Sequence, residues 1–198
     1  MTVNPNNVVW HGGHINREDR ESLFGQKALT IWLTGLSAAG KSTLAFALEK
    51  ALFAEGRTCY ILDGDNIRHG LNKNLGFSNE DRTENIRRIA EVARLMNDAG
   101  MIVITAFISP FIVDREMARQ IIGQDCFREV FVSTALDVYE SRDPKGLYGK
   151  ARAGQVPDFT GISSPYEVPK NPDLVIDTDH VAVENAVLLL TKLIKKRG

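Results

Sequence analysis

Eight consecutive residues, Gly35 to Ser42, have the types and spacing that bind a polyphosphate. They read Gly-Leu-Ser-Ala-Ala-Gly-Lys-Ser, follow the apolar run from Ala28 to Leu33, and precede a segment with helical spacing. Backbone N–H groups of a glycine-rich turn at a helix start form a concave anion site. Lys41 adds a charge for the terminal phosphates, and the Ser42 hydroxyl suits Mg²⁺. The pattern predicts a phosphate-binding loop (P-loop) for a nucleotide with Mg²⁺, contacted by Gly35, Leu36, Ser37, Ala38, Ala39, Gly40, Lys41, Ser42 and Thr43.

A second group of polar residues follows the next apolar run, 58–62, and reads Asp63-Gly64-Asp65-Asn66. Ligands of open α/β sheets bind at the carboxyl ends of the strands. Two acids one residue apart point in different directions, so one can orient Mg²⁺ or take a proton from an attacking hydroxyl, while the other contacts an acceptor substrate. The alternative is an Asp-Gly turn whose side chains only cap local N–H groups.

The third apolar run, 101–107, ends without an acidic residue. Many P-loop proteins place a Mg²⁺-orienting carboxylate at such a strand end, so its absence shifts the metal role to Asp63 and disfavours a GTPase or motor ATPase. Ser109 follows this run. Its hydroxyl either contacts phosphate or accepts a phosphoryl group, or it caps the next helix with Pro110 at the first helical position.

Five arginines lie near the second and third strands: Arg68, Arg82, Arg87, Arg88 and Arg115. Guanidinium groups suit an oxyanion such as phosphate or sulfate, and Phe77, which lies among them with Asn85, can stack on a base. Each arginine could equally lie on a solvated helix face. Together they favour an anionic second substrate.

Strand-like and helical segments alternate along the chain, which predicts an α/β fold with a doubly wound, mostly parallel sheet covered by helices on both faces. Ser78 followed by Asp81 resembles a capping box at the start of the second helix, and Gly100 follows its end. The expected strands are 29–33, 58–62, 101–107, 128–133 and 174–177, and the expected helices are 42–55, 79–98, 111–122 and 181–196.

One segment, 143–172, interrupts this alternation and has no sustained periodicity. It is longer than an ordinary connection, and it is rich in glycine with several lysine and arginine residues. In a phosphate-binding domain such a segment suggests a lid that closes over the nucleotide. A passive surface excursion is the alternative.

Length and composition limit the number of domains, the kind of partner and the cellular location that we expect. A chain of 198 residues that is 43% hydrophobic fits one domain, 1–198, with 1–27 as an N-terminal extension. The net charge of −1 argues against a basic surface for nucleic acid or an anionic membrane. Cys59 and Cys126 lack metal-binding spacing and fit reduced thiols. No signal peptide or membrane-spanning run is evident, so we expect a cytoplasmic protein.

The order of several long motifs resembles that of adenylylsulfate kinases, P-loop kinases that phosphorylate the 3′-hydroxyl of adenosine 5′-phosphosulfate (APS) with ATP. The resemblance covers nearly the whole chain, although Ala38-Ala39 stand where the family often has a glycine. The matching segments are Asp63-Gly64-Asp65-Asn66-Ile67-Arg68, Leu75-Gly76-Phe77-Ser78, Asp81-Arg82, Glu84-Asn85-Ile86-Arg87-Arg88, Phe107-Ile108-Ser109-Pro110, Asp143-Pro144-Lys145-Gly146-Leu147-Tyr148, Lys150-Ala151-Arg152-Ala153-Gly154 and Phe159-Thr160-Gly161.

The resemblance implies a site for each substrate. The reaction would yield 3′-phosphoadenosine 5′-phosphosulfate and ADP, with Lys41, Asp63 and Ser109 in catalytic positions and Ser42 and Asp63 on the metal. In such enzymes the serine at the position of Ser109 is sometimes assigned as a phosphoserine intermediate. A homodimer and an association with ATP sulfurylase are further family expectations. APS contacts would come from Asp65, Asn66, Ile67, Arg68, Phe77, Arg82, Asn85, Ile108, Ser109, Lys145, Phe159 and Thr160.

Two alternatives stay open at this point, one of them another kinase and the other not an enzyme. A small-molecule kinase of the shikimate or gluconate type would share the P-loop and the acidic second strand. A non-catalytic nucleotide-binding regulator would bind ATP without turnover. Phe77 and the arginines favour an acceptor that carries both a base and an oxyanion.

Overall fold

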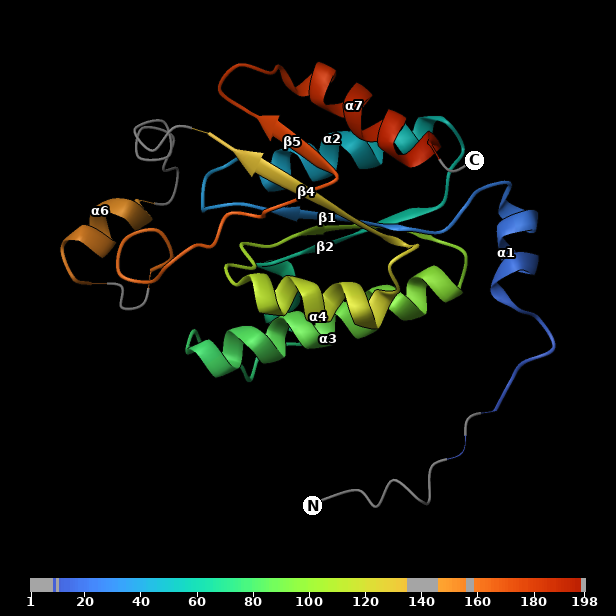
Figure 1. Ribbon diagram of the computed structural model, residues 1–198, viewed down its shortest axis with the longest axis horizontal. Helices are drawn as coiled ribbons and strands as arrows, with labels where there is room; N and C mark the ends of the chain where they lie inside the picture. Colours follow the sequence, from blue (N-terminus) through green and yellow to red (C-terminus); the bar gives the residue numbers. More distant parts are fainter. Residues whose placement is uncertain (1–8, 10, 135–145, 156–158, 197–198) are drawn as a thin grey trace.

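A five-stranded parallel sheet lies at the centre of the chain, with strand order β2-β3-β1-β4-β5 (Figure 1). The computed structural model describes residue 9 and residues 11–134, 146–155 and 159–196. The five expected strands are confirmed to within one residue at each end. They are β1 (Thr30–Thr34), β2 (Cys59–Asp63), β3 (Ile102–Ala106), β4 (Phe127–Ser133) and β5 (Leu174–Asp177).

Helices cover both faces of this sheet, which confirms the doubly wound α/β prediction. In Figure 1, α2 and α7 lie on one face, and α3 and α4 lie on the other. These four helices match the four expected helical segments. They are α2 (Lys41–Ala54), α3 (Asn79–Asp98), α4 (Ile112–Ile122) and α7 (Val183–Lys195); the shorter helices are α1 (Arg17–Phe24), the 3₁₀ helix η2 (Asn66–His69) and α6 (Leu147–Arg152).

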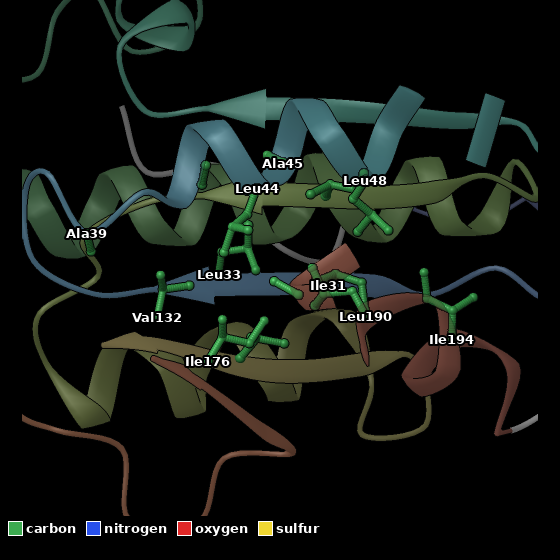
Figure 2. Close-up of a cluster of buried hydrophobic side chains, with 14 of the residues drawn as sticks. Ile31, Leu33, Ala39, Leu44, Ala45, Leu48, Val132, Ile176, Leu190 and Ile194 are labelled. Atoms are coloured by element: carbon green, nitrogen blue, oxygen red, sulfur yellow. The ribbon is translucent and has the colours of Figure 1, made fainter. Parts of the chain in front are cut away.

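The alternation of β1 side chains divides the core into two layers. Successive strand residues point to opposite faces. Ile31 and Leu33 pack with Leu44 of α2 and Leu190 of α7 (Figure 2). Trp32 points to the other face, into the cluster that α3 and α4 cover, and it stacks near Phe107 and Phe127. Both faces of β1 are therefore buried, which fixes the strand in the middle of the sheet.

Parallel pairing brings the carboxyl ends of the strands to one edge. Leu33 of β1 pairs with Ala106 of β3, and Ala106 also pairs with Asp63 of β2. The loops that follow β1, β2 and β3 therefore leave the sheet side by side. These loops are the P-loop, the Asp63–Asn66 turn and the Phe107–Pro110 segment.

The helix starts differ in part from expectation. The Ser78 side chain accepts a hydrogen bond from the Asp81 N–H, but the Asp81 carboxylate accepts from Gly76, so the expected capping box is only half formed. The N-cap of α4 is Phe111, without a side-chain cap. The alternative in which Ser109 caps this helix with Pro110 in first position is therefore wrong, because the helix begins two residues later, at Ile112, after the extended Phe111.

The N-terminal extension contains a helix, α1, that the sequence analysis did not anticipate. Asn16 and Asp19 form a complete capping box at its start. The Glu21 carboxylate is buried and accepts hydrogen bonds from Arg17, Lys27 and the Ala28 N–H, which lowers its pKa against the opposing effect of burial. The helix is short and strongly polar, so hydrophobic periodicity did not reveal it.

The segment 143–172 is not devoid of regular structure, because it contains α6. Residues 143–145 and 156–158 of this segment lie outside the described residues. None of the described helices is both long and apolar enough to cross a membrane.

Candidate active site

The loops at the carboxyl edge of the sheet surround one cavity of about 1150 Å³, called here the central cavity. It is bounded by the P-loop, the end of β2, the first turns of α3, the end of β3 and the segment around Phe159. Most residues singled out from the sequence line it: Ser37, Ala38, Gly40, Lys41, Ser42, Thr43, Asp63, Asp65, Arg68, Phe77, Arg82, Asn85, Ile108, Ser109, Phe159 and Thr160.

Five other candidates do not line the central cavity: Gly35, Leu36, Ala39, Asn66 and Ile67. A Cβ on Gly35 would collide with the Val132 carbonyl oxygen, so this glycine lets the P-loop leave β1 beside β4. Ala39 is fully buried in the core, and Ile67 packs against the cluster around Trp32. Contacts of these five residues with substrate stay predictions. Lys145 lies outside the described residues.

Lys41 is held by its own loop. Its Nζ donates hydrogen bonds to the carbonyl oxygens of Gly35 and Leu36, at 2.9 and 2.6 Å. Burial of the ammonium lowers the pKa of Lys41 to about 8, while the nearby carboxylates of Asp63 and Asp65 oppose this effect. The residue retains some exposed surface, but the ammonium itself lies among loop carbonyls and acidic groups, and this enclosure determines the direction of the shift.

Ser42 and Asp63 meet at the floor of the central cavity. Ser42 Oγ donates a 2.7 Å hydrogen bond to Asp63 Oδ2. The other carboxylate oxygen, Oδ1, accepts from the N–H groups of Asp65 and Asn66 at 3.0 and 3.4 Å. Asp63 therefore does more than cap the local turn, because its second carboxylate oxygen contacts the P-loop. Its role towards metal or substrate stays a prediction.

The second half of the cavity combines an aromatic ring with cations. The Arg68 guanidinium lies 4.3 Å from the Phe77 ring centroid and donates to the carbonyls of Leu75 and Gly76. Arg82 lies 6.0 Å from the same ring and donates to the Phe77 carbonyl. The Phe77 ring is 60% exposed, so it remains accessible for stacking on a base.

Asn85 completes this half from the second turn of α3. It is buried, and its Oδ1 accepts a 2.9 Å hydrogen bond from Asn72 Nδ2. Asn72 is fully buried and belongs to the loop that carries Arg68 and Phe77. This side-chain bond ties that loop to α3 and fixes the Asn85 amide at the cavity wall.

Three of the five arginines do not line the cavity, so the structure gives no support for their part in anion binding. Arg87 and Arg88 both pair with Glu84 on the outer side of α3, and their hydrogen bonds lower the pKa of Glu84 to about 2. Arg115 is buried and pairs with Glu129 of β4. Helix phase places Arg82 and Asn85 on the cavity side, whereas Arg87 and Arg88 lie on other sides of the helix.

Ser109 is 2% exposed, and its hydroxyl is engaged on both sides. Its Oγ accepts from Trp32 Nε1 at 3.1 Å and donates to Thr34 Oγ1 at 3.0 Å. Its backbone has a φ of 40°, in the left-handed region that non-glycine residues seldom adopt. The structure thus directs this hydroxyl towards β1 rather than towards the helix start.

The segment around α6 contacts both halves of the cavity. The Tyr148 hydroxyl donates to the Ser37 carbonyl of the P-loop at 3.1 Å, and the Tyr148 ring meets Phe159 edge-on. Thr160 Oγ1 accepts a 2.9 Å hydrogen bond from Arg82 Nη1. These contacts favour a lid over a passive surface excursion.

The end of a fourth strand, β5, also lies at the cavity, and its residues were not predicted. Thr178, Val181 and Val183 line the cavity after β5, and Thr178 Oγ1 donates to the Ala39 carbonyl at 3.0 Å. The available signal was the position of Thr178, a polar residue directly after a parallel strand, where ligands of such sheets bind.

Comparison with known proteins gives a consistent result. A family model described as adenylylsulphate kinase matches residues 27–177. The chain is 53% identical to an adenylyl-sulfate kinase of Staphylococcus epidermidis over 96% of both chains, and 56% identical to one of Prochlorococcus marinus over 98% of both. A Mycobacterium tuberculosis APS kinase, solved in complex with AMPPNP and APS, superposes with a TM-score of 0.82 at 46% identity, covering 86% of this chain and 99% of that one.

Proposed function

The chain belongs to the adenylyl-sulfate kinase family and phosphorylates the 3′-hydroxyl of APS with ATP, and we propose that the central cavity holds both substrates during this reaction. One observation carries the proposal: the P-loop and the Arg68–Phe77–Arg82 group line the same cavity. A donor phosphate and an acceptor hydroxyl can therefore meet in one enclosed space. The product would serve sulfate assimilation. Neither the regulator nor the shikimate or gluconate type of kinase is supported.

The donor half is the P-loop and the start of α2. Its N–H groups and the positive end of the α2 dipole would hold the phosphates of ATP. Lys41 would move from the carbonyls of Gly35 and Leu36 to the β- and γ-phosphates. There it would neutralise charge that develops during transfer.

Ser42 and Asp63 fit a Mg²⁺ ion, because a hydroxyl and a carboxylate oxygen only 2.7 Å apart are the hard oxygen ligands that this cation prefers. When bound with ATP, the ion would neutralise phosphate charge. Ser42 would be a direct ligand, and Asp63 would orient the ion. The contact between Asp63 and the P-loop favours this role over that of general base, in which Asp63 would take the proton of the attacking hydroxyl.

The acceptor half would bind APS through its two distinctive groups. The exposed face of Phe77 would stack on the adenine, and Arg68 and Arg82 would pair with the phosphosulfate oxygens. Asp65, Asn85, Ile108, Phe159 and Thr160 would shape the rest of this half. In the transfer step, the 3′-oxygen forms a bond to the γ-phosphorus and the bond from that phosphorus to the β–γ bridging oxygen breaks. ADP leaves with the bridging oxygen, and the hydroxyl proton is released to solvent water.

The test is APS-dependent ADP release by the purified chain, with Mg²⁺ and ATP. We expect one ADP for each 3′-phosphorylated product, and no such release with gluconate or shikimate. ATP binding without turnover on APS would contradict the proposal and favour a regulator. A single domain over 1–198 with 143–172 as its lid, a homodimer, an association with ATP sulfurylase and a cytoplasmic location stay predictions.

A further inference from the structure

The buried guanidinium of Arg115 makes three short hydrogen bonds that reach two different loops. The residue is 3% exposed and lies in the first turn of α4. Nε donates to Glu129 Oε1 at 2.7 Å, Nη1 to the Ser109 carbonyl at 2.6 Å, and Nη2 to the Glu167 carbonyl at 2.7 Å. Only one of these three acceptors is an acid.

The first loop contacted is a wall of the central cavity. Ile108, Ser109 and Pro110 line the cavity, and the backbone of Ser109 has the unusual φ of 40°. Such a conformation persists only where the surroundings hold it. Arg115 Nη1 and the bonds of the Ser109 hydroxyl to Trp32 and Thr34 supply that restraint.

The second loop contacted is the chain that returns from Phe159 and Thr160. Glu167 lies at its end, next to Tyr166, whose hydroxyl is 3.0 Å from Thr34 Oγ1. The Arg115 guanidinium also lies 5.8 Å from the Tyr166 ring centroid. Glu167 is further tied to the cavity wall through the Pro110 carbonyl and the Ile112 N–H. Arg115 therefore lies between the cavity wall and the return of the predicted lid.

We propose that Arg115 is a positioning residue for the acceptor half, holding the Ile108–Pro110 wall and the 159–167 segment in register without touching substrate. The inference rests on the proposed function, because it assigns this wall to APS. An ion pair that only held the fold together would need Glu129 alone. Arginine is required because its planar guanidinium donates in three directions at once, which the single ammonium of lysine cannot reproduce in the same plane.

Arg119 provides a matched control on the same helix, one turn later. Its guanidinium lies 3.5 Å from Glu129 Oε2 and 4.0 Å from Asp173 Oδ2, and among the described residues it makes no hydrogen bond to either loop. Arg115→Lys and Arg119→Lys therefore change the same charge network and helix. Only the first removes the bonds to the two backbone carbonyls.

The experiment measures kcat and KM for APS by ADP release, and the Kd of AMPPNP by calorimetry, in both variants and the unmodified chain. We expect Arg115→Lys to lower kcat/KM for APS by about tenfold to 10²-fold, as for small misplacements at an active site. The Kd of AMPPNP should change less than about threefold, because the P-loop is untouched. Arg119→Lys should match the unmodified chain. Equal kcat/KM in both variants, or a parallel loss of AMPPNP affinity, would overturn the inference.

Glu129→Gln separates positioning from stability if Arg115→Lys folds poorly. The amide oxygen still accepts from Nε, so the ion pair weakens while both carbonyl bonds can remain. For Glu129→Gln we expect a lower thermal midpoint and a kcat/KM for APS within about threefold of that of the unmodified chain. A loss of kcat/KM that follows the loss of stability would overturn the inference.

The outcomes distinguish the two proposals. If the unmodified chain releases no ADP with APS, the proposed function itself fails. If only the variants deviate from expectation, the role of Arg115 alone fails.

Discussion

Ser42 and Asp63 are joined by a 2.7 Å hydrogen bond between Oγ and Oδ2, although 21 residues separate them in the chain. Ser42 lies in the first turn of α2, and Asp63 is the last residue of β2. Because β2 is separated from β1 by β3, only the crossover of the parallel sheet brings these residues together. The bond links the donor loop to the strand end that faces the acceptor half.

The first prediction concerns this pair. Asp63→Asn keeps the shape of the side chain but removes its charge, so we expect kcat to fall by at least about 10²-fold, the effect of losing a preorganised charge. If Asp63 orients Mg²⁺, the variant should also require more Mg²⁺ for half-maximal rate. Asp98→Asn, at the far end of α3, is the charge-matched control and should leave both values unchanged. A near-normal kcat for Asp63→Asn would contradict the role.

The second prediction follows from the pKa of Lys41, which is lowered to about 8. Above pH 8 the unliganded side chain is mostly neutral, whereas bound phosphates favour its charged form. Nucleotide binding should therefore take up a proton, and the affinity should fall by up to about tenfold per pH unit above pH 8. Calorimetry in two buffers of different ionisation enthalpy measures this uptake.

The matching variant is Lys41→Ala, which should lose this pH dependence and at least about 10²-fold in turnover, since a transition-state charge contact is removed. A nucleotide affinity that stays constant from pH 7 to about pH 9.5 in the unmodified chain would show that Lys41 does not titrate there.

The third prediction is that Ser109 is not an obligatory phosphoryl acceptor. Its hydroxyl is buried and bonded to both Trp32 and Thr34. Ser109→Ala should keep turnover within about tenfold, while leaving the Trp32 N–H unpaired should lower the free energy of unfolding by about 1–3 kcal/mol. Rapid quench with labelled ATP and no APS provides the decisive measurement. A stoichiometric phosphoenzyme that APS discharges would establish the intermediate instead.

The fourth prediction concerns strain in the P-loop. Ala38 has a φ of 61°, which costs a non-glycine residue about 1–2 kcal/mol. Ala38→Gly should relieve this strain and, after the entropy that glycine loses on folding, raise the free energy of unfolding by up to about 1 kcal/mol. Ala39→Gly should instead lower the free energy of unfolding, because Ala39 is fully buried and the variant would lose its methyl contacts. Urea unfolding of both variants checks this contrast.

The fifth prediction concerns stability in acid. Hydrogen bonds from Arg87 and then Arg88 lower the pKa of Glu84 to about 2 from an ordinary value of 4.5. A lowered carboxyl pKa stabilises the fold above pH 4.5, and this contribution is lost as the pH falls towards 2. Because the side chain is 33% exposed, solvent screening keeps the effect below about 1 kcal/mol. Glu84→Gln should remove it. If the unfolding curves of Glu84→Gln and of the unmodified chain coincide at pH 7 and again at pH 3, the stabilising role of Glu84 is contradicted.

Much of the fold could be predicted because its signals are local. The five strands are short apolar runs, and Gly35 to Ser42 is a continuous loop whose function depends on neighbouring backbone groups. Helix α1 could not be predicted in this way, because it is held by the capping box at Asn16 and by the buried Glu21 rather than by an apolar face.

Most candidate residues were placed correctly at the cavity, but the sequence did not show which long side chains reach it. Arg68, Arg82 and Arg115 have the same chemistry in the sequence, yet the first two line the cavity and the third is buried against Glu129. No local pattern separates them, because the direction of a long side chain depends on the elements packed around it.

By itself, the sequence determined the class of fold, the P-loop and the kind of ligand, since these depend on residue types at fixed short spacing. Tertiary structure alone decided which residues meet. It brings Ser42 into contact with Asp63 and places Thr178 beside the P-loop. It also directs the Ser109 hydroxyl towards Trp32 and the Arg115 guanidinium towards the backbone of two loops. The physical reason is that these contacts arise from strand order and helix phase, which depend on packing between segments far apart in the chain.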